Sequence, residues 1–213
     1  MNRSLAASAT AVAVLALSAL TTSSAQADTS SERLQKSIDE QIAEYGGTQV
    51  SDYAVAYDDG AVVVFPNPVT GEAPDNLGTG TRQGRAQSYN LDTDPNDNVG
   101  LRSAVQGCPS GWTPNSDWFC FYQYKNFKGK RWQFKDTSVG YAANWGFDNK
   151  TSSWVNNRSD WVIDTYRILD SKCRGKDSMF VMGHGKSSAV DSRVDNKLTA
   201  WKAQHVKNWP GCS

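Results

Sequence analysis

The strongest constraint on the fold is a seven-residue phrase that occurs twice in the second half of the chain. The first copy, DNKTSSW, covers residues 148–154, and the second copy, DNKLTAW, covers residues 195–201. Asp, Asn, Lys and Trp recur at the same places, and Ser at the fifth place becomes Thr. Self-similarity at a spacing of 47 residues is typical of a duplicated supersecondary unit. We therefore predict two related units in this half.

Short aromatic runs separated by turn residues fill the chain from Cys108 onward and indicate strands. The candidate strands are 118–124, 130–135, 152–155, 161–169, 178–182 and 198–206. Strands of this length and spacing predict an all-β sandwich. Trp154 and Trp201 occupy equivalent places in the repeat, so we expect them to be equivalent core residues.

The first 27 residues have the pattern of a signal peptide. Arg3 precedes a short apolar run, and the small residues Ala25 and Ala27 follow where a signal peptidase would cleave. We predict a secreted, extracellular protein with residues 1–27 removed and no membrane anchor after cleavage. The chain has four cysteines, an even number that fits an oxidising compartment and two disulfides.

Residues 28–65 predict a helix followed by a hairpin. Thr29 and Glu32 have the spacing of a capping box, and apolar residues then recur at helical spacing as far as Tyr45. An Asp-Gly step at residues 59–60 is a hairpin turn signal between two apolar runs. Such a segment buries little apolar surface alone. It is therefore either a pro-segment or a piece that docks on the later domain.

Residues 66–107 are rich in Gly, Pro, Asn, Asp and Thr and predict a flexible linker. The domain that follows is predicted to span residues 108–213. The chain carries 22 basic and 22 acidic residues, so a basic surface for nucleic acid is not expected. His184 and His205 are the only histidines and no HExxH motif occurs. We therefore predict that the protein is not an enzyme.

Beyond the repeat, the order of residues in the first unit resembles a known family. Tyr122 precedes Gly129 by seven residues, and the D/N-D/N-x-x-S/T-S stretch begins nineteen residues later at Asp148. This order resembles the Greek-key unit of βγ-crystallins, of which two make one double-sheet domain. The CPSG run at residues 108–111 and the CFY run at 120–122 resemble the secreted bacterial branch called peptidase inhibitor family I36. That branch includes a small inhibitor of metalloproteinases.

The resemblance covers residues 108–213 and is most complete up to residue 156. In the second unit the interval from Tyr166 to Gly175 is two residues too long, unless Ile168 takes the place of the aromatic. Ala200 also replaces the final Ser of the stretch. The implied fold is an all-β, βγ-crystallin-like Greek-key double-sheet domain, preceded by the signal peptide, the helix-hairpin segment and the linker.

Four cysteines allow three connectivities. The resemblance implies that Cys108 and Cys120 close the first loop, which leaves Cys173 and Cys212 as the second pair. It also implies a monomeric, non-catalytic inhibitor of an extracellular peptidase. The candidate inhibitory loop is Cys173, Arg174 and Gly175, because Cys173 would tether it to the C-terminal end.

The alternative implied by the resemblance is a calcium-binding structural, binding or toxin-like module of the cell exterior. Calcium takes hard oxygen ligands, and each copy of the phrase supplies a carboxylate, an amide oxygen and a hydroxyl. The candidate ligands are Asp148, Asn149 and Ser152 in the first copy and Asp195, Asn196 and Thr199 in the second.

Overall fold

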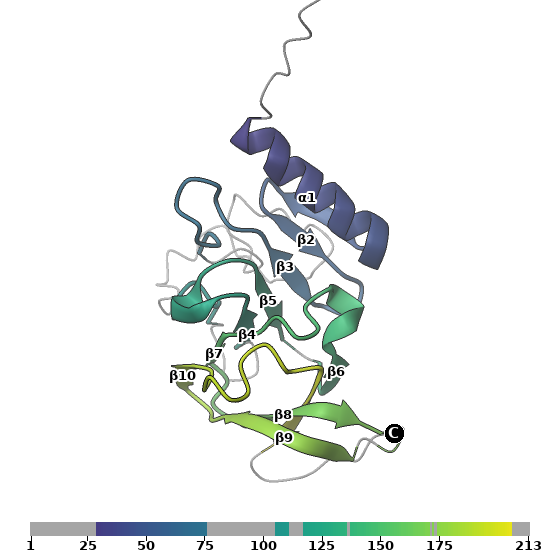
Figure 1. Cartoon of the computed structure of the whole chain (residues 1–213), viewed down its shortest axis with the longest axis vertical. Helices are drawn as coiled ribbons and strands as arrows, with labels where there is room; N and C mark the ends of the chain where they lie inside the picture. Colours follow the sequence, from purple (N-terminus) through teal and green to yellow (C-terminus); the bar gives the residue numbers. More distant parts are fainter. Residues whose placement is uncertain are drawn as a thin grey trace, which may run out of the picture.

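In the computed structural model, the part of the chain that is described forms one α-helix above two antiparallel sheets (Figure 1). The structure describes residues 29–75, 105–110, 117–135, 137–170, 172 and 174–205. The predicted signal peptide lies outside these residues. No helix in the described part of the chain combines the length and the apolar character needed to cross a membrane.

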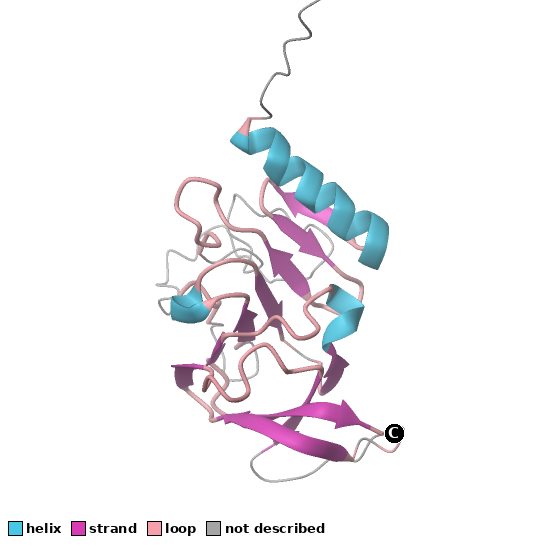
Figure 2. Cartoon of the chain, viewed as in Figure 1, coloured by secondary structure: helices cyan, strands magenta, loops and turns pink. Residues whose placement is uncertain are grey.

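The helix and strands, coloured by type in Figure 2, follow in this order: α1 (Ser30–Tyr45), β1 (Thr48–Ser51), β2 (Ala54–Ala56), β3 (Val62–Val64), β4 (Phe119–Tyr122), β5 (Arg131–Phe134), β6 (Val139–Tyr141), β7 (Ser153–Asn156), β8 (Trp161–Leu169), β9 (Gly175–Met182), β10 (Lys186–Ala189) and β11 (Ala200–His205). Within the residues described, short 3-10 helices occur at Lys125–Phe127 and Ala142–Trp145.

The predicted double-sheet architecture of two Greek-key units is confirmed by the strand pairing. One sheet has the order β1-β2-β3-β5-β4-β7-β10, and the other has the order β6-β11-β8-β9. The first unit is β4 to β7 and the second is β8 to β11. The third strand of each unit, β6 or β10, pairs with the last strand of the other unit, β11 or β7. Each sheet is therefore completed by a strand from the opposite unit.

Strand β8 is held to β9 through a bulge between Asp164 and Tyr166. Thr165 lies in the bulge, where its hydroxyl donates to the Phe180 carbonyl at 2.6 Å and accepts the Phe180 N–H at 2.9 Å. The hydroxyl thus satisfies both backbone groups that the irregular ladder leaves unpaired, as buried backbone groups require. The rest of β8–β9 forms the long hairpin at the bottom of the molecule in Figure 1.

The predicted helix begins at its predicted cap. The Thr29 hydroxyl accepts the Glu32 N–H at 3.2 Å, and the Thr29 N–H donates to Glu32 Oε2 at 2.6 Å. The helix ends at Gly46, whose φ of 76° is in the left-handed region that glycine tolerates. Ile38 on the inner face of the helix is fully buried.

Of the two alternatives for the helix-hairpin segment, the structure shows docking. Strand β3 pairs antiparallel with β5, in the register Val63 opposite Trp132. The Gln41 side chain of α1 and the Trp132 indole both donate to the Trp145 carbonyl, at 3.1 and 2.9 Å. One sheet and one set of hydrogen bonds therefore join the segment to the first Greek-key unit.

The main core lies between the two sheets and is centred on Trp201. Its ring is fully buried and contacts five other rings: Phe119, Phe121, Phe134, Trp145 and Phe147. The ring also lies directly on Gly140 of β6, where any Cβ would overlap it. The repeat-equivalent Trp154 is buried too, but its only ring contact among the described residues is Phe180, at 6.4 Å. The two tryptophans are both core residues, with unequal surroundings.

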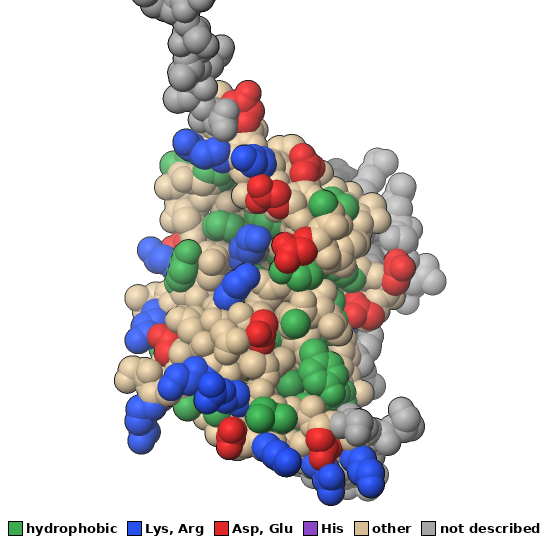
Figure 3. Space-filling model, turned by 45° about the vertical axis from the view of Figure 1, so that its right-hand side comes forward, with side chains coloured by type: hydrophobic (Ala, Val, Ile, Leu, Met, Phe, Trp, Pro, Cys, Tyr) green, Lys and Arg blue, Asp and Glu red, His purple; other side chains and the backbone are tan. Residues whose placement is uncertain are grey.

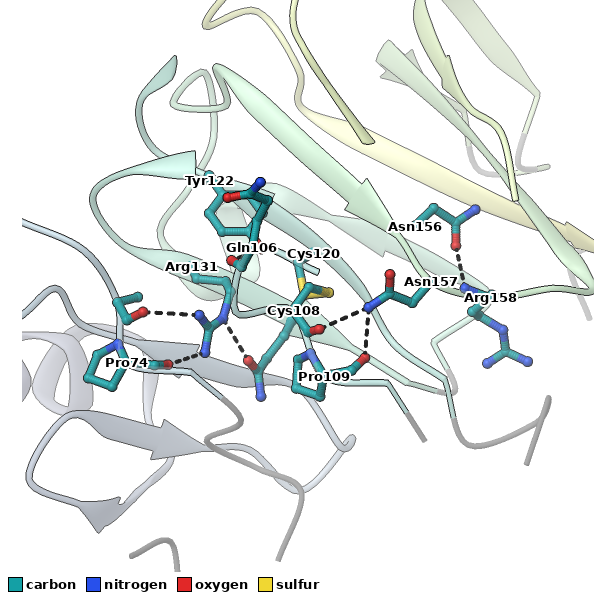
Figure 4. Close-up of a disulfide and its surroundings, with 12 residues drawn as sticks. Pro74, Gln106, Cys108, Pro109, Cys120, Tyr122, Arg131, Asn156, Asn157 and Arg158 are labelled. Atoms are coloured by element: carbon teal, nitrogen blue, oxygen red, sulfur yellow. Dashed lines mark hydrogen bonds between the residues drawn. A yellow bond between two sulfur atoms is a disulfide. The ribbon is translucent and has the colours of Figure 1, made fainter. Parts of the chain in front are cut away.

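The buried Arg131 of β5 joins its own strand to the segment that contains Ala73 and Pro74 (Figure 4). Its guanidinium donates to the carbonyls of Ala73, at 3.3 Å, and Pro74, at 2.6 Å, and to Gln133 Oε1 at 3.0 Å. Burial lowers the pKa of this guanidinium, while the nearby Tyr122 and Asp75 oppose that shift. Residues 66–75, predicted as the start of the linker, therefore form turns against β5.

The predicted disulfide between Cys108 and Cys120 is confirmed, and it lies beside Arg131 (Figure 4). The Asn157 amide donates to the carbonyls of Cys108 and Pro109, at 2.9 and 3.1 Å. These bonds fix the disulfide loop against the end of β7. Cys173 and Cys212 lie outside the described residues, so their predicted pairing stays a prediction.

We predict that Arg131→Met lowers the free energy of unfolding by about 3 kcal/mol, because the substitution leaves buried carbonyls without donors. The measurement is urea unfolding followed by tryptophan fluorescence. The control is Arg193→Met, since Arg193 is 86% exposed and pairs only with the exposed Asp191; its effect should stay within about 0.5 kcal/mol. Equal unfolding midpoints for the two variants would contradict the role of Arg131.

Candidate functional site

The two copies of the repeated phrase lie against each other in the structure. The Asn149 N–H donates to the Leu198 carbonyl at 2.9 Å, and the Asn196 N–H donates to the Thr151 carbonyl at 3.0 Å. Leu198 and Thr151 are equivalent places of the two copies, so these bonds are related by the internal symmetry. Asn149 and Asn196 also share the same left-handed φ of 55°, which asparagine tolerates better than most residues.

The same symmetry relates the backbone hydrogen bonds of the fifth residue of each copy, Ser152 and Thr199. The Ser152 N–H donates to the Tyr122 carbonyl at 2.9 Å, and the Thr199 N–H donates to the Tyr166 carbonyl at 3.1 Å. Tyr166 is therefore the structural counterpart of Tyr122, and Ile168 is not. The Tyr166 ring lies directly on Gly175, where a Cβ would overlap it. In the first unit the ring that lies on Gly129 is that of Tyr124 and not that of Tyr122, so the two units make the aromatic–glycine contact from different positions.

Each paired turn holds a buried carboxylate oxygen with no hydrogen-bond partner among the described residues. These atoms are Oδ1 of Asp148 and Oδ1 of Asp195, again at equivalent places. The second oxygen of Asp148 accepts from the Asn149 amide at 2.8 Å, and that of Asp195 lies 3.6 Å from the Lys125 ammonium. Burying an anionic oxygen without a partner is costly. A cation at each turn would remove that cost.

The other predicted ligands differ in how available they are. The Ser152 hydroxyl donates to Asn196 Oδ1 at 3.3 Å, which brings oxygens of the two copies together. The Thr199 hydroxyl instead donates to the carbonyls of Tyr166 and Arg167 in β8. Among the described residues, no three His, Cys, Asp or Glu side chains come together. A metal site here would therefore depend on amide, hydroxyl and backbone oxygens.

The last Ser of the first copy, Ser153, has a structural role. The Ser153 hydroxyl donates to the Tyr124 carbonyl at 2.7 Å and accepts the Phe127 N–H at 3.1 Å, so it ties down the β4–β5 connection. Ala200 cannot make these bonds in the second copy. The β8–β9 connection must therefore be fixed by other means.

Asp170 fixes the β8–β9 connection from within. Its Oδ1 accepts the N–H groups of Lys172 and Arg174, both at 2.9 Å, and its Oδ2 accepts Arg174 Nε at 2.8 Å. The Asp170 N–H donates to the Arg174 carbonyl at 3.2 Å and closes the turn. We call the described residues of this connection, Asp170, Lys172 and Arg174, the hairpin tip. Sequence reasoning missed Asp170, although Asp at the start of a turn is a known signal for such bonds.

The predicted inhibitory loop shares one described residue, Arg174, with the hairpin tip. Cys173 lies outside the described residues. The Arg174 side chain is 71% exposed, while its guanidinium stays paired with Asp170. Gly175 is the first residue of β9 and lies under the Tyr166 ring. The tip is thus an exposed turn at the end of a regular hairpin.

The hydrogen bonds of the tip determine the pKa of Asp170. The Arg174 N–H, more than any other group, lowers this pKa below its ordinary value of 3.8, and the Arg174 side chain and the Lys172 N–H act in the same direction. A carboxyl whose pKa falls on folding stabilises the fold above its ordinary pKa. That contribution is lost as the pH falls through the lowered pKa.

The described residues define a mostly β, two-sheet protein built from two Greek-key units, with one helix. Residues 102–176, about a third of the chain, match the model of peptidase inhibitor family I36. The match confirms the resemblance predicted from the sequence, and it runs from the disulfide loop through the hairpin tip to the beginning of β9.

Two solved structures are similar to the chain. One, from work on the evolution of the eye-lens βγ-crystallin domain fold, is 14% identical and covers 46% of this chain and 94% of that chain, with a TM-score of 0.35. The other, the N-terminal domain of protein S, is 14% identical and covers 42% of this chain and 97% of that chain, with a TM-score of 0.33. Among curated proteins there is no significant match.

We predict that Asp170→Ala speeds hydrogen exchange at the amides of Lys172 and Arg174 by about tenfold, since both amides lose their acceptor. The matched control is Asp177→Asn, an exposed position on the same hairpin, which should leave both rates unchanged. In the unsubstituted protein, the Asp170 carboxyl should titrate by NMR below pH 3.8. A midpoint at or above that value would contradict the hydrogen-bonded tip.

Proposed function

We propose that this protein is a secreted, non-catalytic inhibitor of extracellular peptidases. The observation that carries the proposal is the match of residues 102–176 to an inhibitor family, because the matched segment includes the hairpin tip. The family match implies a peptidase as the partner. The disulfide Cys108–Cys120 fits an oxidising location outside the cell.

The physical properties of the hairpin tip support the proposal. An inhibitor needs a loop that already has its bound conformation, because ordering a loop on binding costs conformational entropy. Asp170 holds two amides and one guanidinium of the tip, and β8 and β9 pair immediately next to it, with Leu169 opposite Gly175. A turn fixed in this way loses little further freedom when a peptidase binds it.

The expected result of titrating the purified mature protein against a panel of extracellular peptidases is stoichiometric loss of activity of at least one of them. The panel contains a trypsin-like and a thermolysin-like enzyme, followed with chromogenic peptide substrates. Asp170→Ala should weaken the inhibition, because the loosened tip must be ordered again on binding. Full activity of every enzyme at a tenfold molar excess of the protein would refute the proposed function.

We also propose that the paired turns bind calcium, as a second function compatible with the first. The observation in favour is the pair of buried oxygens, Oδ1 of Asp148 and Oδ1 of Asp195, that lack partners among the described residues. The Ser152 hydroxyl and the Asn196 amide oxygen lie 3.3 Å apart between the turns and add neutral oxygens. With one carboxylate in each turn, we expect a Kd of roughly 10⁻⁴ M, in the range of extracellular modules.

Calcium should raise the melting temperature, since a ligand present at a hundred times its Kd stabilises the folded state by about 2.7 kcal/mol for each site. The measurement is calorimetric unfolding with and without calcium, with magnesium as the control ion. Asp148→Asn and Asp195→Asn should each reduce the calcium effect. Asp191→Asn, an exposed position shortly before the second turn, should preserve it. A melting temperature that calcium does not change would exclude these sites.

A further inference from the structure

Lys125 lies beside the second copy of the repeated phrase, although it belongs to the first Greek-key unit. It is the first residue of the 3-10 helix Lys125–Phe127 in the β4–β5 connection. Its ammonium is 3.6 Å from Asp195 Oδ2. The other oxygen of this carboxylate, Oδ1, is buried without a hydrogen-bond partner among the described residues. A cation of the chain itself therefore lies at one of the two turns proposed to bind calcium.

The turn of the first copy has no such cation. Within the part of the chain that the structure describes, Asp148 forms no salt bridge. Its Oδ2 accepts only from the neutral amide of Asn149, at 2.8 Å, and its Oδ1 is buried without a partner there. The two turns therefore present equivalent carboxylates with different charges beside them.

The second unit has no lysine at the place equivalent to Lys125. Lys125 follows Tyr122 by three residues, and Tyr166 is the counterpart of Tyr122. Three residues after Tyr166 stands Leu169, a buried apolar residue of β8. The difference in charge between the two turns therefore comes from the connections that follow the tyrosines, because the repeated phrase itself keeps its Asp and Asn.

Lys128, at the other end of the same 3-10 helix, provides a comparison. Both lysine side chains are 51% exposed, and the Lys128 ammonium lies 3.7 Å from Glu72 Oε1. Basic and acidic side chains are interspersed over the face of the molecule that Figure 3 shows, so a lysine near a carboxylate is common on this surface. The Glu72 side chain is 59% exposed, whereas that of Asp195 is 19% exposed. Lys125 is distinguished by a mostly buried partner, for which screening by salt is weaker.

We propose that Lys125 is an internal competitor of calcium at the Asp195 turn and makes this turn the weaker of two unequal calcium sites. This inference rests on the proposed calcium function and adds the residue that sets the difference in affinity between the turns. In the calcium-free protein the Lys125 ammonium partly neutralises Asp195. A divalent ion that binds there must displace this ammonium or bear the repulsion of a positive charge close to it. The Asp148 turn imposes neither cost.

The test is calorimetric titration of the full mature chain with calcium at low ionic strength. We expect two sites of unequal affinity, of which Asp148→Asn removes the tighter one. In the Asp148→Asn background, Lys125→Met should tighten the remaining site at least about fivefold, because a repulsive charge is removed. Lys125→Arg, which keeps the charge, should leave that affinity within about twofold. Lys128→Met should do the same, because its charge lies at the exposed Glu72.

A metal-free measurement reports on Lys125 without calcium. In a chelating buffer, Lys125→Met should lower the melting temperature more than Lys128→Met does, because the mostly buried Asp195 loses its ion pair while Glu72 stays solvated. Calcium should then raise the melting temperature of Lys125→Met by more than it raises that of the unsubstituted chain.

Two equal sites in the unsubstituted chain would overturn this inference and leave the calcium function intact. A remaining site that Lys125→Met tightens no more than Lys128→Met does would have the same consequence. Calcium binding in the Asp148→Asn background that appears only after Lys125 is replaced would support the inference. If calcium binds none of the variants, the calcium function fails and the inference fails with it.

Discussion

The buried guanidinium of Arg131 is the interaction on which the rest of the structure depends. A charged group can be buried only when its hydrogen bonds are satisfied, and the acceptors here include carbonyls at Ala73 and Pro74, well outside the Greek-key units. The first sheet therefore requires the segment that precedes it. The same cluster adjoins the disulfide loop, where the Tyr122 hydroxyl donates to the Gln106 carbonyl at 2.9 Å. Segments that are separate in the sequence share one buried polar centre.

The two units are related by symmetry in their backbone bonds and unequal in their side chains. The reciprocal bonds of Asn149 and Asn196 join the units at the repeated phrase. In the first unit, the Ser153 hydroxyl fixes the neighbouring connection. In the second unit, Ala200 has no hydroxyl to make the equivalent bonds. Asp170, at the start of the longer β8–β9 connection, fixes that connection by accepting the N–H groups of Lys172 and Arg174. The second unit therefore lacks the hydroxyl that Ser153 supplies in the first, and its β8–β9 connection, which extends to solvent, is held by Asp170 instead.

Much of the fold could be predicted, because its signals are local or repeated. The capping box at Thr29, the two units and the Cys108–Cys120 disulfide all follow from residues close in sequence or equal in spacing. Strands β1, β6 and β10 were missed. Gly140 has no side chain to show a strand pattern, and its strand exists because Trp201 packs on it. Lys186–Ala189 contains no β-branched or aromatic residue. Asp170 has the sequence signal of a turn residue, but the sequence does not show that it accepts the Lys172 and Arg174 amides. The candidate calcium ligands could be named from the repeat. The repeat could not show that the Thr199 hydroxyl donates to a carbonyl of β8.

The pairing of β3 with β5 has a consequence for the behaviour of the protein in solution. Without β3, the strand containing Trp132 and Phe134 would end the sheet with an open row of amides and carbonyls, and such edges recruit other chains. With β3 in place, this end of the sheet is formed instead by β1, which has four residues, Thr48–Ser51, while the opposite end is β10 in either case. Strands β1 to β3 thus move this boundary of the sheet from an aggregation-prone strand to a short strand in which Val50 is the only large apolar residue.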